Sequence, residues 1–169
     1  MIELVVAGAA GRMGGRIVAL AREAGDLQVV GAIERAGHPA LGRDAGEVVG
    51  AGRLGVAITA DVGAVLTRGR VLVEFTAPEA TLEHLRVAAA QGAKAVVGTT
   101  GLSAAHVDEL KGLARATAIL FSPNMSVGVN LAFRVLALMA RALGDDYDVE
   151  VTEIQIGRAS CRERVCSVV

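Results

Sequence analysis

The chain begins with an apolar segment that runs directly into a turn containing three glycines. Residues 3–7 (Glu-Leu-Val-Val-Ala) have the length and character of a buried strand, and Gly8, Gly11 and Gly14 follow. Apolar residues spaced by three and four then continue over residues 13–24, which is the periodicity of a helix packed against a core. A strand, a glycine turn and a helix in this order predict a backbone that turns sharply and leaves the helix N-terminus open to a ligand.

The alternation of strand and helix continues through most of the chain. Apolar runs of strand length are found at residues 3–7, 29–33, 56–59, 71–75, 95–98 and 118–121. Between them, Gly25 is a candidate C-terminal cap, Pro78 a first helical residue, and Ser103 an N-cap, and a short helix is expected around residues 44–48. Repeated β-α units with continuous Val/Ile strands predict an α/β fold, a Rossmann-like doubly wound parallel sheet covered on both faces.

Composition argues against several classes of partner. The formal net charge is −1, with 17 Lys and Arg intermixed with 18 Asp and Glu, so no field is expected that would hold nucleic acid. The most apolar later stretch, residues 125–143, carries Arg134 and Arg141 on one face, which favours an amphipathic helix over a membrane span. The N-terminus lacks the basic start and long apolar core of a signal peptide. We therefore expect a cytoplasmic protein that contacts neither membrane nor nucleic acid.

Glu34 and Arg35 extend the prediction from a turn to a dinucleotide site. Glu34 lies 20 residues after Gly14, at the end of the second strand, where a carboxylate can bond a ribose 2′-hydroxyl. Arg35 could instead pair with a 2′-phosphate, so NADH and NADPH are both admissible. The alternatives are a strand-to-helix turn without a ligand and an ordinary solvated Glu-Arg pair; the combination of loop and spacing favours the dinucleotide.

Two further polar clusters follow later strands and fall at the carboxyl edge of the predicted sheet. The first is Gly98-Thr99-Thr100, whose amides and hydroxyls could contact the nicotinamide ribose, and the second is Ser122-Pro123-Asn124-Met125. Each alone is more often a turn or a helix cap. The segment Glu74–Pro78 has the same ambiguity, because Thr76 and Pro78 suit a helix start.

Taken together, these segments resemble the family of dihydrodipicolinate reductases, lysine-pathway enzymes described as acting on 4-hydroxy-tetrahydrodipicolinate. The matching motifs are Gly-Ala-Ala-Gly-Arg-Met-Gly at 8–14, Glu34-Arg35, Asp-Ala-Gly-Glu at 44–47, Gly-Thr-Thr-Gly at 98–101 and Asn-Met-Ser-Val-Gly-Val-Asn at 124–130. The resemblance covers nearly everything up to Ile154. One departure is Glu74, where the family usually has Asp before Phe-Thr.

The resemblance implies a role for each cofactor-binding segment. The pyrophosphate would be held by Gly8, Ala9, Ala10, Gly11, Arg12 and Met13. Glu34 would bind the adenosine ribose and Arg35 the phosphate of NADPH. The nicotinamide would be placed by Gly98, Thr99, Thr100, Ser122, Pro123, Asn124 and Met125. The implied substrate is a small cyclic dicarboxylate, and the implied assembly of the parent enzyme is a homotetramer.

The family's catalytic His-His-x-x-Lys segment is not found at the expected place. Alignment through residues 148–153 puts Gln155 at the first histidine and Ala159 at the lysine, and neither can serve as the proton donor. Residues 155–169 also contain both cysteines and show no helical or strand period, and they resemble a translated sequencing adapter. We predict no metal site in this segment, because other ligands are lacking nearby.

These features predict three segments. Residues 1–125 form the dinucleotide-binding domain, 126–154 the first helix and strand of an α+β substrate domain, and 155–169 a non-native tail. The parent would be an NAD(P)H-dependent reductase in lysine (diaminopimelate) biosynthesis, and the chain as written would bind cofactor without turnover. The alternatives are a standalone NAD(P)-binding or sensing module and another Rossmann amino-acid dehydrogenase.

Overall fold

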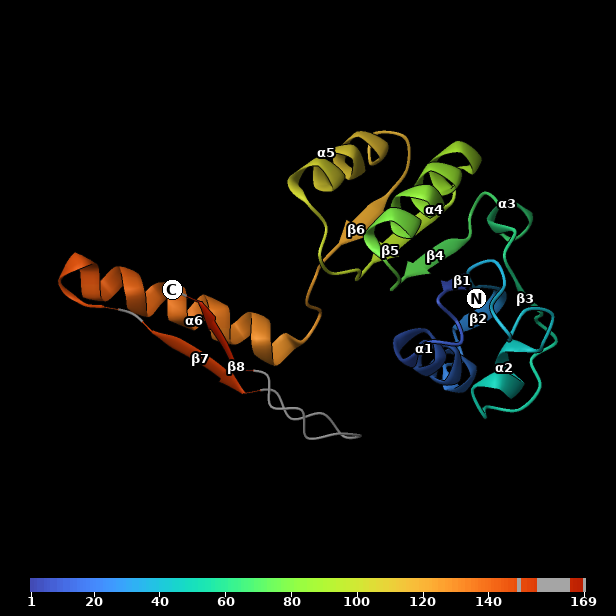
Figure 1. Cartoon of the computed structure of the whole chain (residues 1–169), viewed down its shortest axis with the longest axis horizontal. Coiled ribbons are helices and arrows are strands. Elements are labelled where there is room, and N and C mark those ends of the chain that lie inside the picture. The colour runs from blue at the N-terminus through green and yellow to red at the C-terminus, as the bar shows by residue number, and fades with distance from the viewer. Residues whose placement is uncertain (149, 155–164, 169) are drawn as a thin grey trace. The chain divides into compact units, whose positions relative to one another are not determined.

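A computed structural model describes residues 1–148, 150–154 and 165–168. The chain divides into two compact units, Met1–Met125 and Ser126–Val169 (Figure 1). The first contains every residue for which a cofactor contact was predicted.

The first unit is built on a six-stranded sheet whose strands are all parallel. The strands are β1 (Ile2–Ala7), β2 (Leu27–Ile33), β3 (Ile58–Thr59), β4 (Val71–Glu74), β5 (Lys94–Val97) and β6 (Ile119–Phe121). Their order in the sheet is β3-β2-β1-β4-β5-β6. The direction of winding reverses between β1 and β4, as in a doubly wound sheet. The sequence prediction of a Rossmann-like α/β fold is therefore confirmed.

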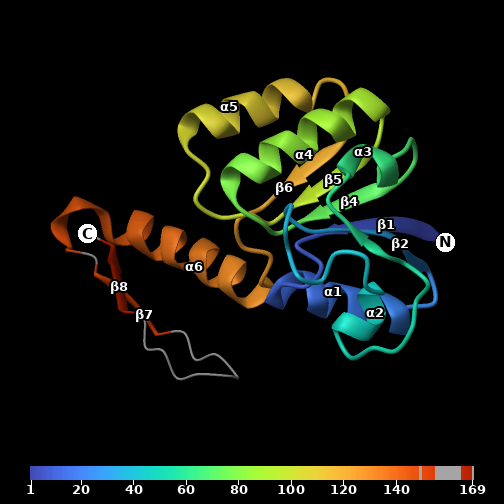
Figure 2. The ribbon, with the colours of Figure 1, turned by 45° about the vertical axis from the view of Figure 1, so that its right-hand side comes forward.

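Helices cover both faces of this sheet. They are α1 (Arg12–Glu23), α2 (Ala45–Val48), α3 (Val62–Val65), α4 (Pro78–Gln91) and α5 (Ala104–Leu113). Figure 2 shows α4 and α5 over one face and α1 with α2 over the other. Side chains of β1 point alternately to the two faces of the sheet. Val5 and Ala7 belong to the core under α4 and α5, and Leu4 and Val6 belong to the core under α1.

The register of the sheet brings the carboxyl ends of five strands into one row. Ala7 of β1 pairs with Ile33 of β2 on one side and with Glu74 of β4 on the other. Glu74 pairs in turn with Val97, and Val97 with Phe121. The segments that follow these five residues therefore emerge side by side at one edge of the sheet.

Several helix ends follow the sequence signals, and one does not. Pro78 is the first residue of α4, Gly92 ends it with a φ of +70°, and Ser103 caps α5 by accepting from the backbone N–H of His106. Gly25, in contrast, does not cap α1. The C-cap is Ala24 in an extended conformation, with its N–H donating to the Leu20 carbonyl.

The buried stripe of α1 differs from the predicted one. Gly14, Gly15, Val18 and Ala21 are buried, whereas Met13 and Leu20, two apolar members of the expected stripe, are about half exposed. Gly14 lies against the backbone of Gly8 and Ala9, and Gly15 lies against the Val49 side chain, so the buried face of α1 begins with two glycines instead of Met13. Helix α3, which spans four residues, has too few apolar repeats to be recognised from periodicity.

The long connection between β2 and β3 is organised by one carboxylate. Asp44 caps the predicted short helix α2 by accepting from the N–H groups of Gly46 and Glu47. The same side chain accepts from Leu54, Gly55 and Val56 at 2.6–3.1 Å. These bonds, led by the Leu54 amide, lower the pKa of Asp44 from its ordinary 3.8 to about 2.

The second unit consists of helix α6 (Val127–Leu143), a 3₁₀ turn (Gly144–Asp146), and the antiparallel strands β7 (Val151–Ile154) and β8 (Val165–Val168). The catalytic positions assigned by resemblance, Gln155 and Ala159, lie outside the described residues. Strand β8 falls in the segment predicted to be a non-native tail.

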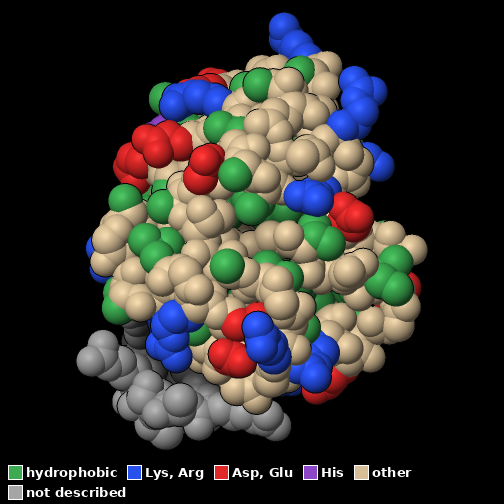
Figure 3. All heavy atoms as spheres, turned by 90° about the vertical axis from the view of Figure 1, so that its right-hand side faces the viewer, with side chains coloured by type: hydrophobic (Ala, Val, Ile, Leu, Met, Phe, Trp, Pro, Cys, Tyr) green, Lys and Arg blue, Asp and Glu red, His purple; other side chains and the backbone are tan. Residues whose placement is uncertain are grey.

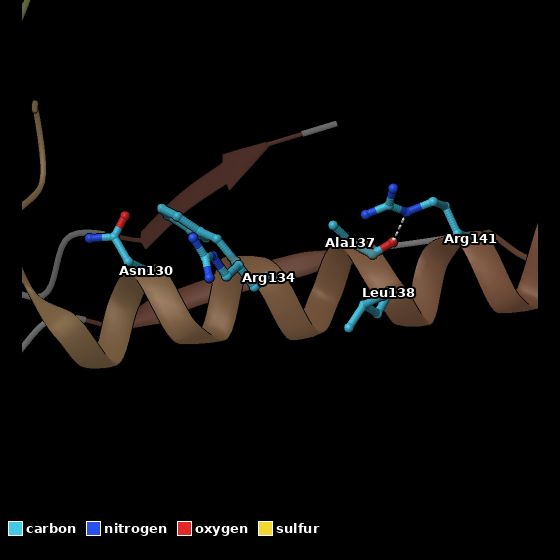
Figure 4. A pocket seen from close by; sticks show the side chains of 6 residues that line it. Asn130, Arg134, Ala137, Leu138 and Arg141 are labelled. Atoms are coloured by element: carbon cyan, nitrogen blue, oxygen red, sulfur yellow. Dashed lines mark hydrogen bonds between the residues drawn. The ribbon is translucent and has the colours of Figure 1, made fainter.

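Helix α6 carries the predicted polar residues Asn130, Arg134 and Arg141 along one side. They line a shallow hollow together with Phe133, Ala137 and Leu138 (Figure 4). Arg141 Nε donates to the Ala137 carbonyl at 3.0 Å. By length and composition alone, residues 127–146 could cross a membrane, with a mean hydropathy of 1.5.

Candidate cofactor site

The five segments that leave the aligned strand ends contain almost all of the predicted site. The residues that directly follow the row are Glu34, Gly8, Phe75, Gly98 and Ser122, in sheet order. These residues are separated by up to 114 positions in the chain, from Gly8 to Ser122, and the parallel register brings them to one edge. Sheets of this type bind ligands at this edge, at the point where the winding reverses.

The glycine turn after β1 is fixed by backbone hydrogen bonds. The N–H groups of Gly8 and Ala9 both donate to the Ile33 carbonyl, at 2.9 and 3.2 Å, and Gly11 N–H donates to the Gly8 carbonyl at 2.8 Å. Gly8 has a φ of +67°, which a side chain would strain. A Cβ on Gly14 would lie 2.1 Å from the Gly8 oxygen, so the turn and the first helical turn touch at the backbone.

The first turn of α1 presents unused amide donors at this edge. Gly11 is the N-cap and forms no side-chain cap, and the first intrahelical bond runs from Gly15 N–H to the Gly11 carbonyl at 2.8 Å. Among the described residues, the N–H groups of Arg12, Met13 and Gly14 therefore have no backbone acceptor within the helix. Three amides at the positive end of a 12-residue helix are suited to a phosphate.

Glu34 is tied to the glycine turn. Its Oε1 accepts from Ala10 N–H at 3.0 Å, and its side chain is half-buried, whereas Arg35 is exposed. A pocket beside this pair is lined by Gly8, Ile33, Glu34, Arg35, Thr76, Ala77, Ala80 and His84. The structure thus brings together the two residues predicted to read the ribose and the turn predicted to hold the pyrophosphate.

A buried carboxylate lies at the centre of the same edge. Glu74, the last residue of β4, has no exposed surface. Its Oε2 lies 2.8 Å from His84 Nδ1, and its Oε1 accepts from the hydroxyls of Thr76 and, at 3.4 Å, Thr81. These partners come from the start of α4 and its first two turns. From the sequence, Glu74 was noted in an ambiguous helix start and as a departure from the family's Asp, but it was not predicted to be a site residue.

The Gly98–Thr100 turn is held from beneath by this cluster. Thr99 is 2% exposed, and its hydroxyl bonds Thr81 Oγ1 at 2.8 Å and accepts from Thr76 N–H at 3.2 Å. The Thr99 side chain therefore faces the protein, and the exposed member of the pair is Thr100. Gly98 is required because a Cβ there would lie 2.0 Å from the Phe75 ring.

The segment after β6 ends the first unit. Ser122 N–H donates to the Val97 carbonyl at 3.0 Å, which extends the β5–β6 pairing by one residue, and Ser122 Oγ donates to the Asn124 carbonyl at 2.7 Å. Ser122 and Asn124 are half-buried, and Pro123 and Met125 are exposed. This segment therefore leaves the sheet edge as a compact turn.

Thr81 and His84 are site residues that the sequence analysis missed. Both lie within α4, where periodicity was used only to find the apolar residues. Their spacing of three places them on the same helix face as the buried Leu85 and Ala88, and a polar residue on a core-facing stripe is the signal that could have indicated them.

The surface around the first unit carries both signs of charge. In Figure 3, basic and acidic side chains lie interspersed over the face shown. Arg86 and Glu109 form one such pair across α4 and α5, with Nε 2.7 Å from Oε1. Among the described residues, no group of three or more His, Cys, Asp or Glu side chains is placed to hold a metal.

The sheet order, the glycine turn after β1 and the open helix N-terminus define a Rossmann-like nucleotide-binding domain. More specifically, the family model for the N-terminus of dihydrodipicolinate reductase matches residues 2–125, and the chain belongs to this family. Membership implies a pyridine nucleotide as the cofactor.

Curated relatives share this family. The chain is 48% identical over 153 residues to the 4-hydroxy-tetrahydrodipicolinate reductase of Citrifermentans bemidjiense, covering 90% of this chain and 57% of that protein. It is 42% identical over 154 residues to the enzyme of the same name from Syntrophus aciditrophicus, covering 91% and 58%. The chain thus spans somewhat more than half the length of these relatives.

A solved structure shows the same fold. Dihydrodipicolinate reductase from Paenisporosarcina sp. TG-14, with dipicolinate bound, superposes with a TM-score of 0.62 at 18% identity, covering 83% of this chain and 54% of that one.

Proposed function

We propose that residues 1–125 bind NADH or NADPH across the carboxyl edge of the sheet, as the cofactor-binding part of a 4-hydroxy-tetrahydrodipicolinate reductase. The single observation that carries the proposal is the alignment of Ala7 and Glu74 at the winding reversal, with the glycine turn leaving β1 at that point. The family relationship supplies the class of cofactor.

The pyrophosphate is assigned to the amides of Arg12, Met13 and Gly14. The turn amides of Gly8 to Gly11 already have acceptors, so the helix amides are the donors that remain. This assignment moves the predicted hydrogen bonds from residues 8–13 to residues 12–14. The glycine turn would let the pyrophosphate come close to the backbone, and the amides in the first turn of α1 would donate hydrogen bonds to it.

The adenosine half is assigned to the β1–β2 side of the site. The Glu34 carboxylate, held by Ala10 N–H, is placed to accept from a ribose hydroxyl. Exposed Arg35 is placed to pair with a 2′-phosphate. The nicotinamide half falls to the β4–β6 side, at Gly98, Thr100 and the turn that begins at Ser122.

The test is equilibrium binding of NADH and NADPH, followed by the fluorescence of the reduced nicotinamide, and of ADP, followed by its displacement of NADH. The chain contains no tryptophan, so tryptophan emission does not interfere. Glu34→Gln keeps an acceptor for Ala10 N–H but removes the charge that repels a 2′-phosphate, and the NADPH to NADH affinity ratio should rise about five- to tenfold. Arg35→Ala should lower the same ratio.

A matched control removes an arginine from the opposite edge of the sheet. Arg115 precedes β6 and is exposed, so Arg115→Ala should leave both affinities unchanged. Failure of the unmodified chain to bind any of the three nucleotides would refute the proposal. Equal effects of Arg35→Ala and Arg115→Ala would refute the assignment of Arg35.

The reaction of the parent enzyme is a hydride transfer that the cofactor supplies when bound. The substrate is proposed to be the small cyclic compound in the relatives' name, and the parent is proposed to be a cytoplasmic homotetramer. Because Gln155 and Ala159 stand where the family's histidine and lysine are expected, we expect this chain to bind cofactor without turnover. Turnover above a protein-free control in an assay of NADPH oxidation would contradict that expectation.

A further inference from the structure

The proposed function leaves the buried cluster around Glu74 without a role. We infer that a directed chain of hydrogen bonds, running from Thr76 N–H through Thr99 and Thr81 to Glu74, positions the nicotinamide end of the cofactor site. We call it the threonine chain. The inference rests on the proposed function and assigns positioning residues to it.

The two ends of the threonine chain have fixed directions. The Thr76 amide can only donate, and it donates to Thr99 Oγ1 at 3.2 Å. The Glu74 carboxylate accepts from the Thr81 hydroxyl at 3.4 Å. Between these ends, the hydroxyls of Thr81 and Thr99 share a 2.8 Å bond that either can donate, and Thr99 donates it when the single Thr81 hydrogen points to Glu74. Thr76 Oγ1 also lies 3.4 Å from Thr81 Oγ1.

A carboxylate at position 74 is energetically costly because the position is buried. Glu74 is fully buried at the end of an otherwise apolar strand, and its Oε2 contacts a histidine whose side chain is 13% exposed. Burial of a charge in such a place is costly, and an apolar residue of similar volume often serves stability at least as well. Among the described residues, no buried side-chain N or O atom lacks a partner, so the cluster is fully satisfied. A satisfied buried network fixes one arrangement of the groups it joins.

What the threonine chain fixes is the turn after β5. Thr99 is buried and immobilised by two bonds, and its neighbour Thr100 is exposed at the sheet edge. The turn also follows Val97, which pairs with Glu74, so it lies on the nicotinamide side of the winding reversal. The other carboxylate oxygen, Oε2, contacts His84, which lines the pocket of Glu34 on the adenosine side. Thr76 also lines that pocket, whereas Thr81 and Thr99 do not, so these two can be substituted without changing the lining of the adenosine side.

The experiment compares two ligands and isosteric variants. NADH occupies both halves of the site, whereas ADP occupies only the adenosine half. Thr81→Val and Thr99→Val each replace a buried hydroxyl by a methyl group, and Thr81→Ser and Thr99→Ser restore the hydroxyl. We expect each valine variant to weaken NADH about five- to tenfold with ADP affinity unchanged, and each serine variant to bind both ligands as the unmodified chain does.

A double-mutant cycle then asks whether the two hydroxyls act through one bond. Thr81→Val combined with Thr99→Val should weaken NADH no more than either change alone. Equal weakening of NADH and ADP, additive effects, or valine variants that bind NADH normally would each overturn the inference while leaving the proposed function intact. Failure of the unmodified chain to bind NADH would overturn both, so the two failures are distinguishable.

Discussion

Substitution of Gly14 by alanine tests the close approach of α1 to the glycine turn. The added Cβ would lie 2.1 Å from the Gly8 oxygen, 2.7 Å from the Gly8 carbon and 3.0 Å from the Ala9 Cα. All three neighbours are backbone atoms, so no side chain can rotate away. For an ordinary contact of 3.4 Å, the Gly8 carbonyl must withdraw by about 1.3 Å.

The cost follows from what this carbonyl holds. Its movement breaks the 2.8 Å bond from Gly11 N–H, which costs about 1 kcal/mol, and overpacking the helix against the turn costs about 1–3 kcal/mol. The helical preference of alanine returns up to about 1 kcal/mol. We therefore expect Gly14→Ala to lower the free energy of unfolding by about 1–4 kcal/mol, compared with the total of about 5–15 kcal/mol of an ordinary domain.

Urea unfolding followed by far-UV circular dichroism measures this change. The matched control is Gly112→Ala in α5, where a Cβ would meet nothing within 4 Å, and the expected change is neutral or stabilising by up to about 1 kcal/mol. A Gly14→Ala variant as stable as the unmodified chain would show that the turn and the helix are not in backbone contact.

Three further outcomes are expected. The three nearest atoms to a Cβ on Gly98 all belong to the Phe75 ring, so Gly98→Ala should destabilise the chain much less when Phe75→Ala removes that ring. Additive changes in the free energy of unfolding for the two substitutions would contradict this. The pKa of Asp44 is lowered from 3.8 to about 2, so the stability that its ionised carboxylate contributes should be complete above pH 3.8 and should be lost as the pH falls toward 2. Asp44→Ala should therefore lower the melting temperature of the chain at neutral pH. It should also weaken the dependence of the melting temperature on pH in this acid range. The side-chain hydrogen bond between the exposed Arg86 and Glu109 raises the pKa of Arg86 and lowers that of Glu109. Exposed ion pairs contribute little to stability at physiological salt, so Arg86→Ala should change the melting temperature only slightly. A large drop in melting temperature would contradict this expectation.

The sequence was sufficient to predict the sheet and most of its edge because the relevant signals are local. Continuous Val/Ile runs mark strands that are buried on both faces, and Pro78 and Ser103 mark helix starts by their own backbone and side-chain chemistry. The glycine turn was predictable for the same reason, since the positive φ of Gly8 and the contact of Gly14 with the Gly8 oxygen both arise within seven residues.

The sequence was not sufficient where contacts between distant segments determine which way a side chain points. Whether Thr99 turns its hydroxyl toward a ligand or toward the protein depends on Thr81 and Thr76, which belong to another strand-helix unit. The buried face of α1 likewise includes Gly15, which lies against Val49 of a distant segment, whereas Met13 is exposed. Neither relation is visible in the periodicity of a single helix.

The row of aligned strand ends also has a consequence for folding. Residues 4–7 of β1 pair with residues 71–74 of β4, so more than sixty residues must be placed before the winding reversal exists. Closing so long a loop costs conformational entropy, and the stabilising contacts between β1 and β4 form only after the loop has closed. The two halves of the candidate site therefore come together in the same event that completes the sheet. A nucleotide that spans them would bind the folded state alone, and its affinity would appear as a rise in the midpoint of unfolding with ligand concentration.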